Sequence, residues 1–181
     1  MSVAIPYQEL TLDSIRNAKM MTRSRIVDLM MKSGKASAPN QVTVRAPKAN
    51  TDLGIANGTD TDEFVTAALT ANTDNVYINS ALANNRYFGV YGISVRHINP
   101  RPPIHEVLLR IGTGGANVLA NLDLQAGYAY RDWCWFLDDP VIYQPTDTVY
   151  VTLGVAVTSG AGTVWVVPMG YIAEPAGQLV M

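Results

Sequence analysis

Residues 148–173 form a run of 26 residues without a charged side chain, and this run constrains the fold more than any other segment. It is long enough to cross a membrane as a helix. Its centre, Thr158–Thr163, is rich in small residues that turn the chain. In Thr148–Val157, Val or Leu at every odd position alternates with Tyr, Thr, Gly or Ala, the period of a strand with one face on a core. We therefore expect a β-hairpin here and no membrane span.

Short runs rich in Val, Ile, Tyr, Trp and Thr recur from Glu63 onward, with no helical spacing between them. Asn, Gly, Pro and Asp separate the runs and turn the chain cheaply. The predicted strands are Phe64–Thr70, Asn75–Ile78, Tyr87–His97, Glu106–Ile111, Val118–Leu124, Tyr128–Leu137, Val141–Tyr143, Thr148–Val157 and Thr163–Ala173. This pattern predicts an all-β antiparallel sandwich or barrel.

The chain before these strands has a different period. Apolar and small residues recur at three- and four-residue spacing from Leu12 to Ser33, with Thr11 or Asp13 as a cap and Gly34 as a stop. Met20, Val27 and Met31 add a second apolar stripe, so this amphipathic helix needs more than one neighbour. It either packs on its own domain or docks on another subunit through adaptable methionines and nearby basic residues. For docking, the candidate contact residues are Ile15, Met20, Arg23, Ile26, Val27, Met30 and Met31.

Charge divides the chain in the same place. Residues 1–48 hold eight basic and three acidic side chains, or +5, whereas the remainder holds five arginines and twelve acids, or −7. All four lysines lie at or before Lys48. Residues 34–61 are rich in Gly, Ala, Pro and Asn, which favours an extended connector. We predict an arm over residues 1–50, made of the helix and the connector, and a β-sandwich domain over residues 51–181.

Few residues suggest chemistry. His97 and His105 are the two histidines, and no Cys or carboxylate stands beside them at zinc-site spacing, so we expect no bound metal. Cys134, the single cysteine, lies between two tryptophans and is expected to be an inert buried residue. Asp138-Asp139-Pro140 is expected to form a turn, although with Asp132 these carboxylates could serve a glycosidase.

The remaining patterns exclude further classes. Gly112-Thr113-Gly114-Gly115 lacks the Lys-Ser/Thr and following helix of a phosphate loop. Five scattered arginines among twelve acids in the β region form no basic stripe, so direct nucleic-acid binding is not expected. We expect neither a cofactor nor enzymatic activity.

A basic, Met-rich helical arm, a Pro/Gly/Ala connector, and a lysine-free β domain that ends in Val167–Gly177 together resemble a small capsid component of a bacterial virus. Two classes share this likeness: decoration or cement proteins, and single jelly-roll coat proteins. The resemblance implies a jelly-roll-like sandwich that forms a homodimer or homotrimer. It also implies an arm that reaches the major capsid protein or other virion subunits, in a virion made in the host cytoplasm.

One alternative comes from another class of protein. A receptor- or carbohydrate-binding β-sandwich of a phage tail or adhesin could use exposed aromatic residues to stack on sugar rings. The candidate aromatics are Tyr128, Tyr130, Trp133, Trp135 and Trp165. In strands this apolar, such residues more often belong to the core.

Overall fold

The structure, a computed structural model, describes residues 2–6, 12–55, 63–66, 69–70, 73–97, 104–123, 132–155 and 164–177. The turn predicted at residues 158–163, Tyr128 and Tyr130 lie outside these residues, as do the side chains of His97, Asp132 and Trp133. The helical elements are α1 (Leu12–Lys32), η2 (Pro39–Gln41), α2 (Ala49–Leu53) and η3 (Thr113–Gly115). The strands are β1 (Ser2–Pro6), β2 (Val42–Arg45), β3 (Asp74–Ala81), β4 (Tyr87–His97), β5 (Ile104–Ile111), β6 (Asn117–Asp123), β7 (Asp132–Tyr143), β8 (Thr148–Val155) and β9 (Val164–Pro175).

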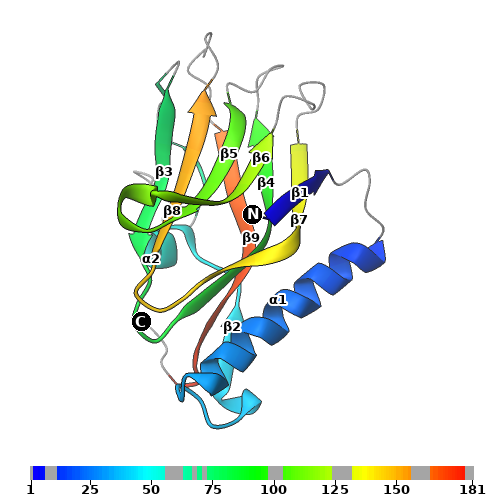
Figure 1. The fold of residues 1–181 in the computed structure, drawn as a ribbon, viewed down its shortest axis with the longest axis vertical. Helices are drawn as coiled ribbons and strands as arrows, with labels where there is room; N and C mark the ends of the chain where they lie inside the picture. The colour runs from blue at the N-terminus through cyan, green and yellow to red at the C-terminus, as the bar shows by residue number, and fades with distance from the viewer. Residues whose placement is uncertain are drawn as a thin grey trace.

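Eight of the strands form two four-stranded antiparallel sheets. The helix-side sheet has the order β2-β9-β4-β7, and the far sheet has the order β3-β8-β5-β6 (Figure 1). The pairs are nested: β5 pairs with β6, β4 with β7, β3 with β8 and β2 with β9. This is a long hairpin rolled into two sheets, the topology of the jelly roll. The predicted all-β sandwich with a helix at its N-terminal side is confirmed, and its strand order is now defined.

The N-terminal strand β1 joins the two sheets. Ser2 and Val3 pair in parallel with Ala120 and Asn121 of β6 in the far sheet. The next residues pair antiparallel with β7 in the helix-side sheet, Ala4 opposite Leu137. One strand thus covers the edges of β6 and β7, which would otherwise present unpaired backbone groups. β1 is not predictable from the sequence, because five residues ending in Pro carry too weak a pattern.

The main core fills the space between the sheets with aliphatic and aromatic side chains, among them the fully buried Phe88 and Tyr143. Two tyrosine hydroxyls tie one sheet to the other. Tyr143 on β7 donates to the carbonyl of Arg110 on β5 at 3.1 Å, and Tyr77 on β3 donates to the carbonyl of Val166 on β9 at 3.0 Å. Burial raises the pKa of both hydroxyls, so both remain donors over the working pH range.

Three strand predictions need correction. The residues described within the predicted strand 64–70 form only an isolated bridge, Val65 to Trp165. The described residues of the predicted strands 128–137 and 141–143 belong to one strand, β7. Asp138-Asp139-Pro140 is therefore not a turn between strands. It lies where β7 shifts register against β4, between Phe136 opposite Gly92 and Val141 opposite Val90, and β1 supports the strand there. An irregularity within a strand uses the same turn-forming residues as a loop.

The connector predicted over residues 34–61 is also structured where it is described. It contains η2, β2 and α2, and β2 pairs with the end of β9, Val44 opposite Ala173. Two arginines and two carboxylates hold this region on the sandwich. Arg45 on β2 and Arg86 before β4 each bond to both Asp52 on α2 and Glu174 on β9, at 2.6–3.0 Å in their closest contacts. Residues 1–50 are thus packed on the sandwich over their described length.

The carboxylate of Asp52 is the most enclosed member of this network, with no exposed side-chain surface. It also accepts a hydrogen bond from the backbone N–H of Lys48 at 2.7 Å. Burial by itself would raise the pKa of Asp52, but the bonds from Arg45 and Lys48 and the charges of Arg45 and Arg86 outweigh burial and lower it. The same contacts raise the pKa of Arg45 against the opposing effect of its own burial.

Candidate interaction surfaces

Helix α1 lies across the outer face of the helix-side sheet and contacts β4, β7 and β9 (Figure 1). Its inner face repeats every four residues, through Ala18, Thr22, Ile26 and Met30, and all four are buried. The hydroxyl of Thr22 donates to the carbonyl of Ala18 at 2.6 Å, which satisfies the polar atom on this apolar face. The helix is therefore anchored to its own domain, one of the two placements that the sequence left open.

A glycine on β4 permits this close approach. A Cβ atom built on Gly89 would lie 2.6 Å from the methyl group of Thr22 and 3.0 Å from a methyl group of Ile26. Any larger residue at position 89 must push the helix away from the sheet. The fit between α1 and β4 is thus specific to this pair of surfaces.

The structure divides the seven candidate contact residues into two sets. Ile26 and Met30 are fully buried within this chain, and Ile15 packs against a cluster formed by Ala18, Tyr91 and Phe136. Ile26 and Met30 thus hold the helix on its own sheet, and Ile15 is half-buried beside them. The other four are Met20, Arg23, Val27 and Met31. Arg23, Val27 and Met31 each follow a buried residue directly, so at 100° per residue they lie on a flank of the helix, whereas Met20 points away from the sheet.

We call Arg16, Met20, Arg23, Val27 and Met31 the outer stripe. Their spacing of three and four residues puts them in one line along the helix. Met20 is 63% exposed, Arg16 and Arg23 are exposed, and Val27 and Met31 are half-buried. Apolar side chains held at the surface beside arginines are typical of protein-contact surfaces.

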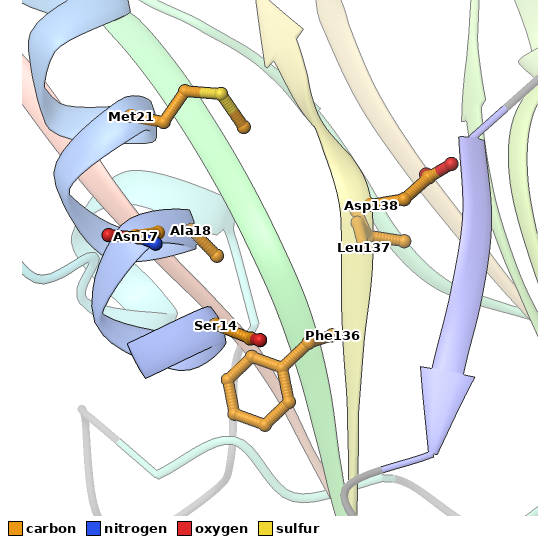
Figure 2. A pocket seen from close by; sticks show the side chains of 7 residues that line it. All are labelled: Ser14, Asn17, Ala18, Met21, Phe136, Leu137 and Asp138. Carbon is orange, nitrogen blue, oxygen red and sulfur yellow. The ribbon is translucent and has the colours of Figure 1, made fainter. Parts of the chain in front are cut away.

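A groove of about 450 Å³ runs between the N-terminal half of α1 and β7. Its lining consists of Ser14, Asn17, Ala18, Met21, Phe136, Leu137 and Asp138, shown in Figure 2. The ring of Phe136 lies below Ser14, whereas Asp138 points toward the β1 side of β7. Among the described lining residues, Asp138 is the ionisable one. The groove therefore offers an apolar floor with a few polar groups at its rim.

The residues with possible chemical roles lie apart. His105 faces Glu106, 3.8 Å from nitrogen to oxygen, on β5. Cys134 is half-buried on β7. Asp139 forms an ion pair with Arg25 of α1, and the backbone N–H of Asp139 donates to Asp138 at 2.8 Å. Over the part of the chain that the structure describes, no group of three or more His, Cys, Asp or Glu side chains could hold a metal ion.

Two aromatic residues from the sugar-binding alternative can be placed. Trp135 is 3% exposed and belongs to the core between the sheets, so this residue cannot stack on a ligand. Trp165 lies on the outer face of the helix-side sheet, with the guanidinium of Arg96 5.6 Å from its ring centre. The guanidinium of Arg96 thus already lies over the ring face on which a sugar would have to stack.

Within the described residues, no helix combines the length and apolar character needed to span a membrane. The strand order and the helix on one sheet define the chain as a jelly-roll domain with an exposed stripe along that helix.

Comparisons with known proteins give little more. No protein-family model and no curated protein matches the chain. One similar solved structure is described as "Structure of infectious bursal disease virus Gx strain", with a TM-score of 0.35 and 8% identity. The match covers 77% of this chain and 33% of the chain in that structure, so this chain spans about a third of the viral chain's length. A likeness this low assigns neither fold nor function.

Proposed function

We propose that this chain is a structural subunit of a virion, which builds the capsid or decorates it as a cement protein. The jelly roll serves viral capsid and lectin domains and also cupins. In this chain the interior between the sheets is packed with aliphatic and aromatic side chains. We therefore assign the function to the outer surfaces. Binding through outer surfaces is what a subunit of an assembly does.

The observation that carries the proposal is the outer stripe of α1. A helix anchored by Ile26 and Met30 holds Met20 63% exposed, with Arg16 and Arg23 beside it. Such a rigid, apolar and basic stripe can bury surface against a partner at about 25 cal/mol per Å² without a large ordering cost. The proposed partners are the major capsid protein or other virion subunits, including copies of this chain as a homodimer or homotrimer. The role is structural and not enzymatic.

The first experiment asks whether the chain is present in virus particles. An antibody raised against the purified protein should label particles isolated from the host in immunogold electron microscopy. Mass spectrometry of the same particles should give a fixed copy number per particle. Particles that contain no copy of the chain would reject the proposed function.

The second experiment asks whether the outer stripe is the contact. Met20→Glu should lower the copy number per particle about tenfold, because it adds a charge to the middle of the stripe. Met20→Leu is the matched control, since it keeps an apolar side chain of similar volume, and it should leave the copy number unchanged. Equal copy numbers of the two variants per particle would show that the outer stripe of α1 is not part of the contact.

The sugar-binding alternative gains no specific support. Trp135 is buried, and Trp165 already has Arg96 over its ring. We therefore propose no second function.

A further inference from the structure

The outer face of the far sheet can be described from the strand register. Side chains in alternate rows of a sheet point to opposite faces. The row Ile78, Val151, Leu109 and Ala120 is buried in the core between the sheets. The rows beside it that face outward are Val76, Thr152, Leu108 and Asn121, followed by Asp74, Gly154, Glu106 and Asp123. This outer face spans all four strands of the far sheet.

Acidic and apolar groups dominate these outward rows. Asp74 and Asp123 are exposed, Glu106 is half-buried, and Val76 is 54% exposed. Arg110 lies in the next outward row and offsets part of the charge, with a 3.5 Å contact to Asp74. We call Asp74, Val76, Glu106 and Asp123 the acceptor face.

Thr152 and Leu108, in the middle of the first outward row, are already buried within this chain, so Asp74, Val76 and Asp123 are among the exposed groups of these rows. The helix that covers the other sheet lies away from this one, because α1 packs on β4, β7 and β9 (Figure 1). Among the described elements, the short η3 and α2 contact strands of the far sheet, and the long helix α1 does not cover it.

The outer stripe of α1 has the complementary character. The helix carries five basic and two acidic side chains, a net charge of +3. Arg16 and Arg23 lie in line with Met20 and Val27. Asp13 extends the same line into the first turn, and Asp28 is on another side of the helix. Apolar side chains with arginines beside them thus face outward on α1, and Val76 with carboxylates beside it faces outward on the far sheet.

We propose that the outer stripe of α1 in one copy packs on the acceptor face of a second copy of this chain. Each far sheet would then be covered by the helix of a neighbour, just as each helix-side sheet is covered by its own helix. Arg16 and Arg23 would meet the carboxylates of the acceptor face, and Met20 would meet Val76. The inference rests on the proposed function, because it names the partner through which the subunit assembles.

This contact joins two different surfaces. Every copy in such a pair keeps one unused outer stripe or one unused acceptor face, so the assembly continues until it closes into a ring or shell. A symmetric dimer that uses one surface twice would stop at two copies. The two possibilities can be separated by experiment.

The test begins with the self-association of the full-length protein, measured by sedimentation equilibrium over a range of concentrations. We expect oligomers larger than dimers that weaken as salt is added. The double variant Arg16→Glu with Arg23→Glu should raise the dissociation constant about tenfold, and so should Val76→Lys. The matched controls are Lys32→Glu, on the other flank of the helix, and Val76→Thr, which keeps the β-branched shape. Both controls should stay within about twofold of the parent protein.

Mixing the two defective proteins identifies the pairing. The arginine double variant retains an intact acceptor face, and Val76→Lys retains an intact outer stripe. An equimolar mixture should therefore form a one-to-one dimer and no larger species. A monomeric parent protein, equal behaviour of variants and controls, or a mixture without this dimer would each overturn the inference.

The inference and the proposed function can fail separately. If the chain is found in virus particles but is monomeric in solution, it has a virion role and the pairing of copies is wrong. If the pairing is confirmed and particles contain no copy of the chain, the pairing stands and the virion role is wrong. Circular dichroism on each variant shows whether a loss of association comes from misfolding.

Discussion

At the scale of single residues, the four-membered ion network gives the clearest stability prediction. Asp52 is enclosed and accepts bonds from Arg45, Arg86 and the backbone of Lys48. Asp52→Ala should lower the free energy of unfolding by about 3 kcal/mol, because it leaves the buried Arg86 with Glu174 as its one remaining carboxylate partner in this network. Urea denaturation measures the loss. Thr51→Ala, at an exposed neighbouring position in the same helix, is the control and should change stability by less than about 0.5 kcal/mol.

The same carboxylate predicts a dependence on pH. The folded-state pKa of Asp52 is lowered, so its contribution is present above the unfolded value of about 3.9 and is lost as pH falls toward the folded value. The stability difference between the parent protein and Asp52→Asn should therefore shrink as pH falls below about 4. Denaturation curves at pH 3 and pH 7 measure it. A difference that grows toward acid pH would contradict the lowered pKa.

The residues of this network could not have been predicted as partners from the sequence. Asp52 and Glu174 are far apart in the chain, and Arg86 is one of several isolated arginines. Spacing reveals a shared helix face or strand face, but it does not reveal which loops a fold brings together. Sequence reasoning identified the helix residues because their period is local. It missed the acceptor face because that face depends on the register of four strands.

At the scale of elements, the contact of α1 with β4 depends on Gly89. Gly89→Ala should destabilise the protein by about 1–3 kcal/mol, because the added methyl group overlaps the methyl group of Thr22. Thr22→Ser removes that methyl group, so the double variant Gly89→Ala with Thr22→Ser should lose less stability than the two single changes added together. A double-mutant cycle by chemical denaturation measures the coupling. Simple additivity would show that the helix does not pack on Gly89.

The helix itself was predictable, and its second apolar stripe was too. The pattern could not tell which of the two stripes faces the domain, because both are apolar and both have helical spacing. In the structure, a glycine on β4 determines which side of α1 faces the sheet. Gly89 creates the hollow that receives Thr22 and Ile26, and this fixes the rotation of α1 on the sheet.

At the scale of the whole molecule, the described parts of residues 1–34 belong to the sandwich as much as the later strands do. Deletion of these residues removes β1 from the edges of β6 and β7 and uncovers the apolar residues beneath α1, among them Tyr87 and Ala173. We expect the truncated protein to aggregate, because exposed edges and apolar patches both promote association. Light scattering after refolding measures this. A soluble, cooperatively folding fragment would show that the sandwich does not need its N-terminal residues.

The sandwich class was predictable because alternation and turn residues are visible in the strands from Tyr87 onward. The jelly-roll order was not, since nested and non-nested pairings use strands of the same composition. The charge division near residue 48 is visible in the sequence, but the contacts across it are not. Opposite charges meet across it, as Arg45 does with Glu174.

The position of β1 also determines when the domain can complete its folding. Residues 2–6 are synthesised before their partners in β6 and β7, which lie more than a hundred residues later in the chain. The hairpin of β5 and β6 closes the shortest loop, and each enclosing pair must bring together residues further apart. We therefore expect folding to proceed outward from the middle of the chain, and to be slow for a domain of this size. β1 can pair only after β6 and β7 have been synthesised.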